Sequence, residues 1–141
     1  MAVTKSMLEQ YGAIQIEIRQ LRADIRKAED SIAKLVEEGT VKDKVYGGDG
    51  GIQGFVIEGF PEREYNRRLK TLRNKKQKLI KRESDLIEMT YQMETMISEI
   101  PISRDRIIFR SLYLEGMTQE QVARILHIDR SLVSKIVSRY L

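Results

Sequence analysis

The side chains best suited to chemistry lie near the C-terminus, on a segment whose apolar residues have helical spacing. Between residues 130 and 140, Val133, Ile136, Val137 and Tyr140 would share one face of a helix. The other face would carry Arg130, Ser131, Ser134, Lys135, Ser138 and Arg139. Small hydroxyl groups let a helix approach base edges in the major groove, and Arg or Lys can donate to guanine or to phosphates. The segment is therefore predicted to contact double-stranded DNA.

We expect these side chains to divide between bases and backbone. The predicted base-reading residues are Arg130, Ser131, Ser134 and Lys135. Helix-turn-helix modules hold the DNA backbone with the preceding helix and with the far end of the recognition helix. A helix start also supplies N–H donors to anions. The predicted phosphate contacts are therefore Thr118, Gln119, Arg124, Ser138 and Arg139.

Three short helices are predicted to position this surface. The first begins at Ser103 and ends at the Glu115-Gly116 pair. Its predicted core residues are Ile107, Ile108, Leu112 and Leu114. Thr118 and Gln121 have the spacing of a capping box, which predicts a second helix over 119–126. Asp129 is expected to cap the third helix, from Arg130 to about Tyr140.

The turn between the last two helices depends on Ala123 and His127. Ala123 stands where two helices need a small residue to approach, and His127 is of a type that tolerates positive φ better than most. His127 is the only histidine and the chain has no cysteine. No Ser/His/Asp set and no Cys/His metal site can be assembled around it, so we expect no enzyme, no metal and no cofactor.

Composition agrees with a cytoplasmic protein that binds a polyanion. The net charge is +4, which permits a nucleic-acid partner without requiring one. The absence of cysteine suits a reducing compartment. No apolar run approaches the roughly 18 residues that a membrane span requires, and the first residues lack a signal core, so we expect no membrane association.

The remaining residues predict two long helices. Apolar residues repeat at alternating steps of four and three from about Thr4 to Glu38, and a weaker seam follows Pro61. The first seam is Met7, Tyr11, Ile14, Ile18, Leu21, Ile25, Ala28, Ile32 and Leu35. The expected fold is mainly all-α, a long antiparallel coiled-coil hairpin (residues 1–100) followed by a helix-turn-helix domain (101–141), with the boundary at Pro101.

Residues 39–60 hold seven of the nine glycines and are predicted to form the tip loop of the hairpin. A short β-hairpin is the simplest arrangement, because Val41, Val45 and Tyr46 precede the glycines and residues 55–57 follow them. The segment lacks the Gly-Lys-Ser/Thr of a P-loop and the strand and helix context of a dinucleotide loop. A turn is therefore preferred to a nucleotide site.

Residues 63–82 contain ten Lys or Arg and one acid, Glu64. They could follow a phosphate backbone, or they could be the solvated face of a coiled coil whose charges the first helix neutralises. The acids available there are Glu17, Asp24, Glu29, Asp30, Glu37 and Glu38. The ion-paired interpretation is preferred, and both remain open.

Residues 106–141 resemble the promoter-binding C-terminal domain of bacterial sigma factors, in which an acidic-Gly pair precedes Thr/Ser-Gln-Glu and then an alanine, here Thr118 to Ala123. The wider layout is similar to small phage-encoded transcriptional regulators of the RinA and ArpU type. Those proteins carry an Asp-x-Val-x-Gly-Gly/Ser segment and a later Ile-x-Gly, here residues 43–48 and 57–59. His127-Ile128-Asp129 replaces the commoner Gly-Ile-Ser, so the resemblance does not extend to a promoter sequence.

This resemblance implies a regulator of phage late or structural genes in a bacterial host cell, with host RNA polymerase as a further partner. Two other classes stay open: the small terminase subunit of phage DNA packaging, and a polymerase-binding interaction module. We also expect a homodimer, because several apolar residues of the second helix lie beyond its seam. They are Ile80, Ile87, Met89 and Tyr91.

Overall fold

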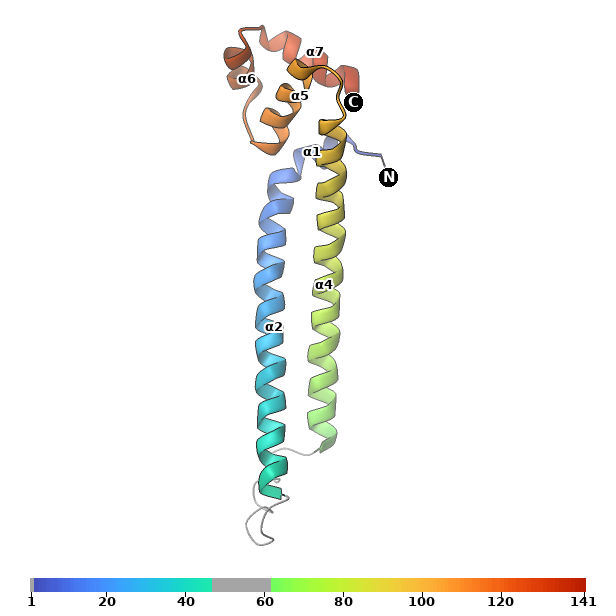
Figure 1. Cartoon of the computed structure of the whole chain (residues 1–141), viewed down its shortest axis with the longest axis vertical. Helices are drawn as coiled ribbons and strands as arrows, with labels where there is room; N and C mark the ends of the chain where they lie inside the picture. Colours follow the sequence, from blue (N-terminus) through green and yellow to red (C-terminus); the bar gives the residue numbers. More distant parts are fainter. Residues whose placement is uncertain (1, 47–61) are drawn as a thin grey trace. The chain divides into compact units, whose positions relative to one another are not determined.

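The computed structural model describes residues 2–46 and 62–141, and over these residues it is mainly helical with no strand. Figure 1 shows the elements in chain order. They are α1 (Lys5–Glu9), α2 (Tyr11–Tyr46), α4 (Glu62–Ser98), α5 (Ser103–Phe109), the π-helix η1 (Arg110–Leu114), α6 (Gln119–Leu126) and α7 (Arg130–Tyr140). The predicted mainly all-α class is confirmed.

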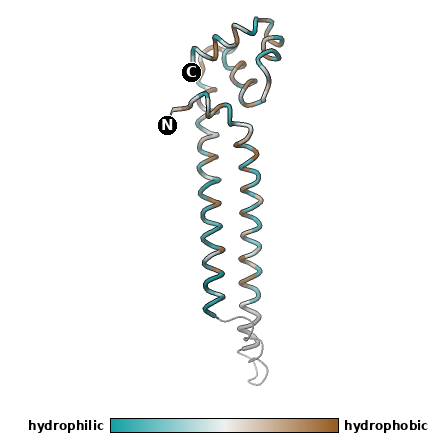
Figure 2. The backbone as a smooth tube through the Cα atoms, turned by 180° about the vertical axis from the view of Figure 1, so that it is seen from behind, coloured by the Kyte–Doolittle hydropathy of each residue, from teal (hydrophilic) through white to brown (hydrophobic). Residues whose placement is uncertain are grey.

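The chain forms two compact units, which are described separately. Unit 1 comprises Met1–Arg19 with Ser84–Leu141, and unit 2 is Gln20–Glu83. The expected boundary at Pro101 corresponds to the break between α4 and α5, whereas the division by contacts groups the end of α4 with the C-terminal helices. Figure 2 shows apolar residues recurring between hydrophilic ones along both long helices.

Within unit 2, α2 and α4 run antiparallel in a fixed register. Arg22 Nε lies 3.0 Å from Glu83 Oε2, and Glu29 Oε2 lies 3.3 Å from Lys76 Nζ. One heptad forward along α2 thus moves the partner one heptad backward along α4. Between the helices, α2 contributes the buried residues Leu21, Ala28 and Leu35. The residues that α4 contributes are half-buried and include Leu69, Leu72 and Leu79.

The predicted start of the tip loop at Gly39 is wrong, because α2 continues to Tyr46. Val41, Val45 and Tyr46 therefore belong to a helix and not to a strand. A Cβ at Gly39 would lie 2.6 Å from Cε2 of Tyr65, so this glycine lets the aromatic ring approach the backbone of α2 instead of ending the helix. The other predicted strand, 55–57, and the glycine cluster lie outside the described residues.

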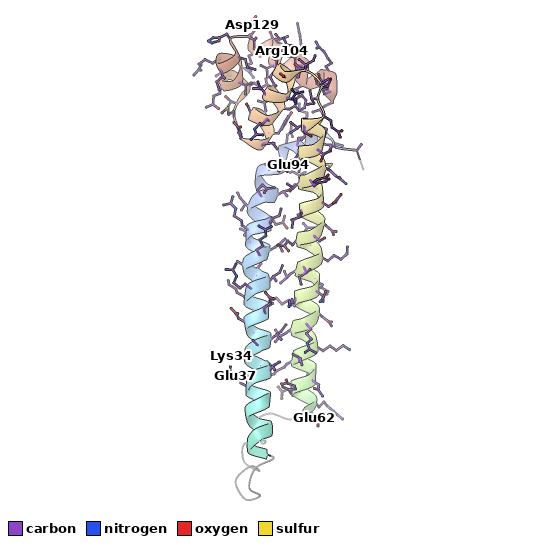
Figure 3. All side chains as sticks on the ribbon, in the orientation of Figure 1. Lys34, Glu37, Glu62, Glu94, Arg104 and Asp129 are labelled. Carbon is purple, nitrogen blue, oxygen red and sulfur yellow. The ribbon has the colours of Figure 1, made fainter. Side chains whose placement is uncertain are left out.

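In unit 1, the start of α2 and the end of α4 are also antiparallel. The Tyr11 hydroxyl donates to Glu94 Oε1 at 2.8 Å (Glu94 is labelled in Figure 3), and Gln15 Nε2 donates to Thr90 Oγ1 at 2.9 Å. The core between them is apolar and buried: Leu8, Ile14, Ile18, Leu86, Met93 and Ile97. Gln15 and Thr90 close one side of this core with a hydrogen bond between neutral groups.

The single helix predicted from about Thr4 is in fact two. Thr4 caps α1 by accepting from the Met7 N–H at 3.2 Å, and the chain then tightens at Gln10, whose N–H donates to the Met7 carbonyl at 3.0 Å. This i to i−3 bond is the tight turn that often ends an α-helix. The break places Leu8 in the core, where it is 1% exposed.

The Tyr11 phenol is expected to ionise late in an alkaline titration. Burial, reinforced by the bond to Glu94, raises the pKa of Tyr11 from 10.0 to about 12. The folded state favours the neutral phenol, so its contribution to stability is complete below pH 10 and is lost as the pH rises toward 12. Phenolate absorbance should show a transition near pH 12 that Tyr11→Phe removes.

The matched control for this titration is Tyr91→Phe, because the Tyr91 side chain is 63% exposed on α4. That variant should keep the late transition. Survival of the transition in Tyr11→Phe would show that another tyrosine is responsible.

Candidate nucleic-acid interface

Helix α6 begins with the predicted capping box. Thr118 Oγ1 accepts from the Gln121 N–H at 3.1 Å, and the Thr118 N–H donates to Gln121 Oε1 at 2.9 Å. Two N–H groups that the helix leaves without an internal partner are thereby satisfied. The predicted bounds of α6 are confirmed, and the predicted phosphate contacts Thr118 and Gln119 lie at its first turn. Thr118 is exposed and Gln119 is half-buried.

The turn after α6 has the geometry expected of His127. This residue has φ 56° and ψ 45°, in the left-handed region, and is the one non-glycine residue with positive φ in the described part of the chain. The Ile128 N–H donates to the Ala123 carbonyl at 3.0 Å, which closes the end of the helix. Ala123 is buried, as the expected close approach of the two helices requires.

Asp129 occupies the N-cap position of α7, but its side chain makes no capping hydrogen bond, so that part of the prediction is wrong. The first turn is held instead by backbone bonds. The Leu132 and Val133 N–H groups donate to the Asp129 carbonyl at 3.0 and 3.3 Å. The carboxylate of Asp129 therefore does not fix the start of the helix.

Helix α7 separates a buried face from an exposed one, as its spacing predicts. Val133 and Ile136 are 0% exposed and Val137 is 3% exposed. The exposed residues are Arg130, Ser131, Ser134, Lys135, Ser138 and Arg139. The structure thus gathers all four predicted base-reading residues and two predicted phosphate contacts on one helix. Arg124, the remaining predicted phosphate contact, is exposed on α6.

The helix preceding this pair differs from the predicted one. It is α-helical only to Phe109 and continues as a π-helix, in which the Glu115 N–H donates to the Arg110 carbonyl at 3.0 Å. A π-turn adds a residue to the helical period and rotates the faces that follow. Of the four predicted core residues of this helix, only Ile108 is buried. Phe109, which the spacing did not single out, is 0% exposed.

A second feature that the sequence did not reveal links α5 to the end of α7. Asp105 is 0% exposed, and its Oδ2 accepts from the Tyr140 hydroxyl at 2.6 Å. Arg104 Nε donates to the other carboxylate oxygen at 3.3 Å. The hydrogen bond to Asp105 raises the pKa of Tyr140, so the neutral phenol is the form that holds the last turn of α7.

Phe109 packs beside this link. Its ring meets Tyr140 edge-on, with centroids 5.5 Å apart and an interplanar angle of 85°, and lies 5.7 Å from the ring of Tyr113. Edge-to-face pairs of this kind add to the stability that burial of the rings supplies. The one signal in the sequence that could have predicted the link between α5 and α7 is an acid, Asp105, in the first turn of one helix together with Tyr140 on the inward face of another.

The described residues contain no cluster of three His, Cys, Asp or Glu side chains that could hold a metal ion. Among the same residues, no helix combines the length and the apolar character needed to cross a bilayer. The exposed faces of α6 and α7 present hydrogen-bonding and cationic side chains. No family model, curated protein or solved structure gives a significant match to this chain.

Proposed function

We propose that this chain is a sequence-specific, double-stranded DNA-binding regulator of transcription. The observation that carries the proposal is the exposed face of α7, where three cations and three serine hydroxyls are held by a buried apolar face. Cations and small hydroxyls are the donors that read base edges and phosphates in the major groove. In this proposal α6, the His127 turn and α7 form a helix-turn-helix.

The roles of the exposed residues follow from their positions. Arg130, Ser131, Ser134 and Lys135 occupy the first half of α7 and would read bases, since recognition helices enter the groove by their N-terminal residues. Ser138 and Arg139, at the far end, would contact phosphates. On α6, Arg124, the N–H of Gln119 and the hydroxyl of the N-cap residue Thr118 would hold the backbone on the other side of the groove.

The same proposal assigns residues 1–100 to a coiled-coil stem and places the protein in the cytoplasm of a bacterial host. The resemblance to phage regulators favours late or structural genes as targets and host RNA polymerase as a partner. A homodimer is supported by exposed apolar side chains in unit 1, where Ile87 is 41% and Tyr91 63% exposed. A dimer would bind two half-sites.

Selection of random duplex DNA on the purified protein, at about 0.15 M salt, tests this function. We expect enrichment of one motif, and Arg130→Ala and Lys135→Ala should each lose about 1–3 kcal/mol of discrimination at one position of it. Arg19→Ala, an exposed cation of α2 in the same unit, is the matched control and should select the same motif.

Absence of any enriched motif, or a motif indifferent to Arg130 and Lys135, would overturn the recognition-helix assignment. Ring-sized assemblies in solution would favour the DNA-packaging alternative. Binding to polymerase without binding to DNA would favour the interaction module.

A further inference from the structure

Unit 2 carries the positive charge of the molecule. Residues 20–83 hold sixteen Lys or Arg and eleven Asp or Glu, whereas the rest of the chain holds nine and ten. Figure 2 shows the first part of α4 as strongly hydrophilic. The unit that contains the proposed recognition helix is therefore nearly neutral, and long-range attraction to a polyanion would come from the other unit.

Six residues of α4 in unit 2 form a line along one face of the helix, which we name the basic stripe. The basic stripe is Arg67, Thr71, Asn74, Lys75, Lys78 and Arg82. Successive members are separated by one, three or four residues, and all six fall within one side of the helix. They border two hollows along α2 and α4 that share Thr71.

The acids of α2 do not neutralise three of the cations in this stripe. Lys76 and Glu83 of α4, which form the ion pairs with α2 described above, lie at the seam and outside the stripe. Within the described part of the chain, Arg67, Lys75 and Lys78 make no ion pair or hydrogen bond. The ion-paired interpretation of this basic run therefore holds for Lys76 and not for these three cations.

The residue types of the basic stripe are better suited to binding a phosphate backbone than to binding another protein. Hydroxyl, amide and cationic side chains are the usual donors to a nucleic-acid backbone. A protein interface would need aromatic or large apolar anchors. Among the described residues of unit 2, Val36 is the one large apolar side chain that is exposed, at 37%, and it lies on α2. Leu21 and Leu79, beside the stripe, are buried and half-buried.

We propose that the basic stripe is a second nucleic-acid contact, which binds the phosphate backbone of a DNA duplex without reading its sequence. This second contact rests on the proposed function and extends it, because sequence selection and general affinity for DNA then belong to different surfaces. The exposed face of α7 selects the sequence, and the stripe supplies affinity to every duplex through release of counterions.

The test is the salt dependence of binding by the full chain to a duplex carrying the selected motif and to a scrambled duplex. The stripe variant is Arg67→Gln, Lys75→Gln and Lys78→Gln together. The slope of log K against log salt should become shallower by about 0.9 for each phosphate that the variant no longer neutralises, hence by about 2–3, and equally on both duplexes. Circular dichroism checks that helix content is retained.

The matched control removes the same charge from exposed positions of unit 2 outside the stripe: Arg26→Gln on α2, with Lys70→Gln and Arg73→Gln on α4. It should leave the slope close to that of the unmodified protein. Equal effects of the two triple variants would mean a diffuse charge effect and would overturn the stripe as a contact surface.

Failure of the stripe and failure of the proposed function give different results. An unchanged slope in the stripe variant, with discrimination at one motif position still lost in Arg130→Ala, overturns the stripe alone. Absence of all duplex binding by the unmodified protein overturns both. A changed molecular mass in DNA-free solution, seen only for the stripe variant, would assign the surface to a second copy of the chain instead.

Discussion

Phe109→Ala is expected to lower the free energy of unfolding of unit 1 by about 3–5 kcal/mol, the usual cost of truncating a buried phenylalanine. The Phe109 side chain is 0% exposed, and its ring contacts both Tyr113 and Tyr140. Because Tyr140 ends α7, the cavity would loosen the helix that carries the proposed base-reading residues. Urea denaturation measures the stability loss, and amide hydrogen exchange in α7 locates it.

The matched control is Ile107→Ala, two residues earlier on the same helix, where the side chain is 44% exposed. That change removes apolar volume without emptying a core site, so its effect should stay below about 1 kcal/mol. Similar losses in the two variants would mean that Phe109 does not support the packing of α5 on α7. Slower exchange throughout unit 1 in Phe109→Ala would contradict the prediction outright.

The parts of the fold that sequence could predict are those determined by neighbours in the chain. The bounds of α6 follow from Thr118 and Gln121, because a capping box is satisfied within four residues. The left-handed turn follows from the tolerance of His127 for positive φ. The exposed face of α7 follows from the spacing of its apolar residues. Each of these signals is local, and each is confirmed.

The parts that sequence missed depend on contacts between distant residues. The glycine content predicts that the first long helix ends at Gly39. The need for glycine there comes instead from the close approach of the Tyr65 ring, which lies on the other long helix. The π-helix leaves the predicted Leu112 and Leu114 half-buried, whereas Phe109, which precedes it, is buried against Tyr113 and Tyr140. Helical periodicity assumes a constant period, so one wider turn misplaces every residue after it.

The candidate site was predictable to the same extent. Spacing alone identifies the exposed residues of α7, yet it gives no account of what holds the end of that helix. Asp105 and Tyr140 are 35 residues apart in the sequence, and no local pattern pairs a buried acid with a distant phenol. The charge pattern of the long helices likewise predicts attraction between them but could not show which cations the acids would leave without partners.

Asp105→Ala is the second large effect, and we expect a loss of about 1.5–3 kcal/mol in the stability of unit 1, the usual contribution of a hydrogen bond to a charged group. The carboxylate is 0% exposed, accepts from the Tyr140 hydroxyl at 2.6 Å and pairs with Arg104. Glu99→Ala, at an exposed acid, is the control and should change stability little in urea denaturation.

A double-mutant cycle with Tyr140→Phe separates this link from a general effect of charge. If the hydrogen bond carries the stability, the Asp105→Ala and Tyr140→Phe effects will be strongly non-additive, because each variant removes the same contact. The folded state favours the neutral phenol, so the contribution is complete below pH 10 and falls as the pH rises through the raised pKa of Tyr140. Tyr140→Phe should therefore abolish part of the alkaline loss of stability. Additive effects and an unchanged pH profile would show that Asp105 does not act through Tyr140.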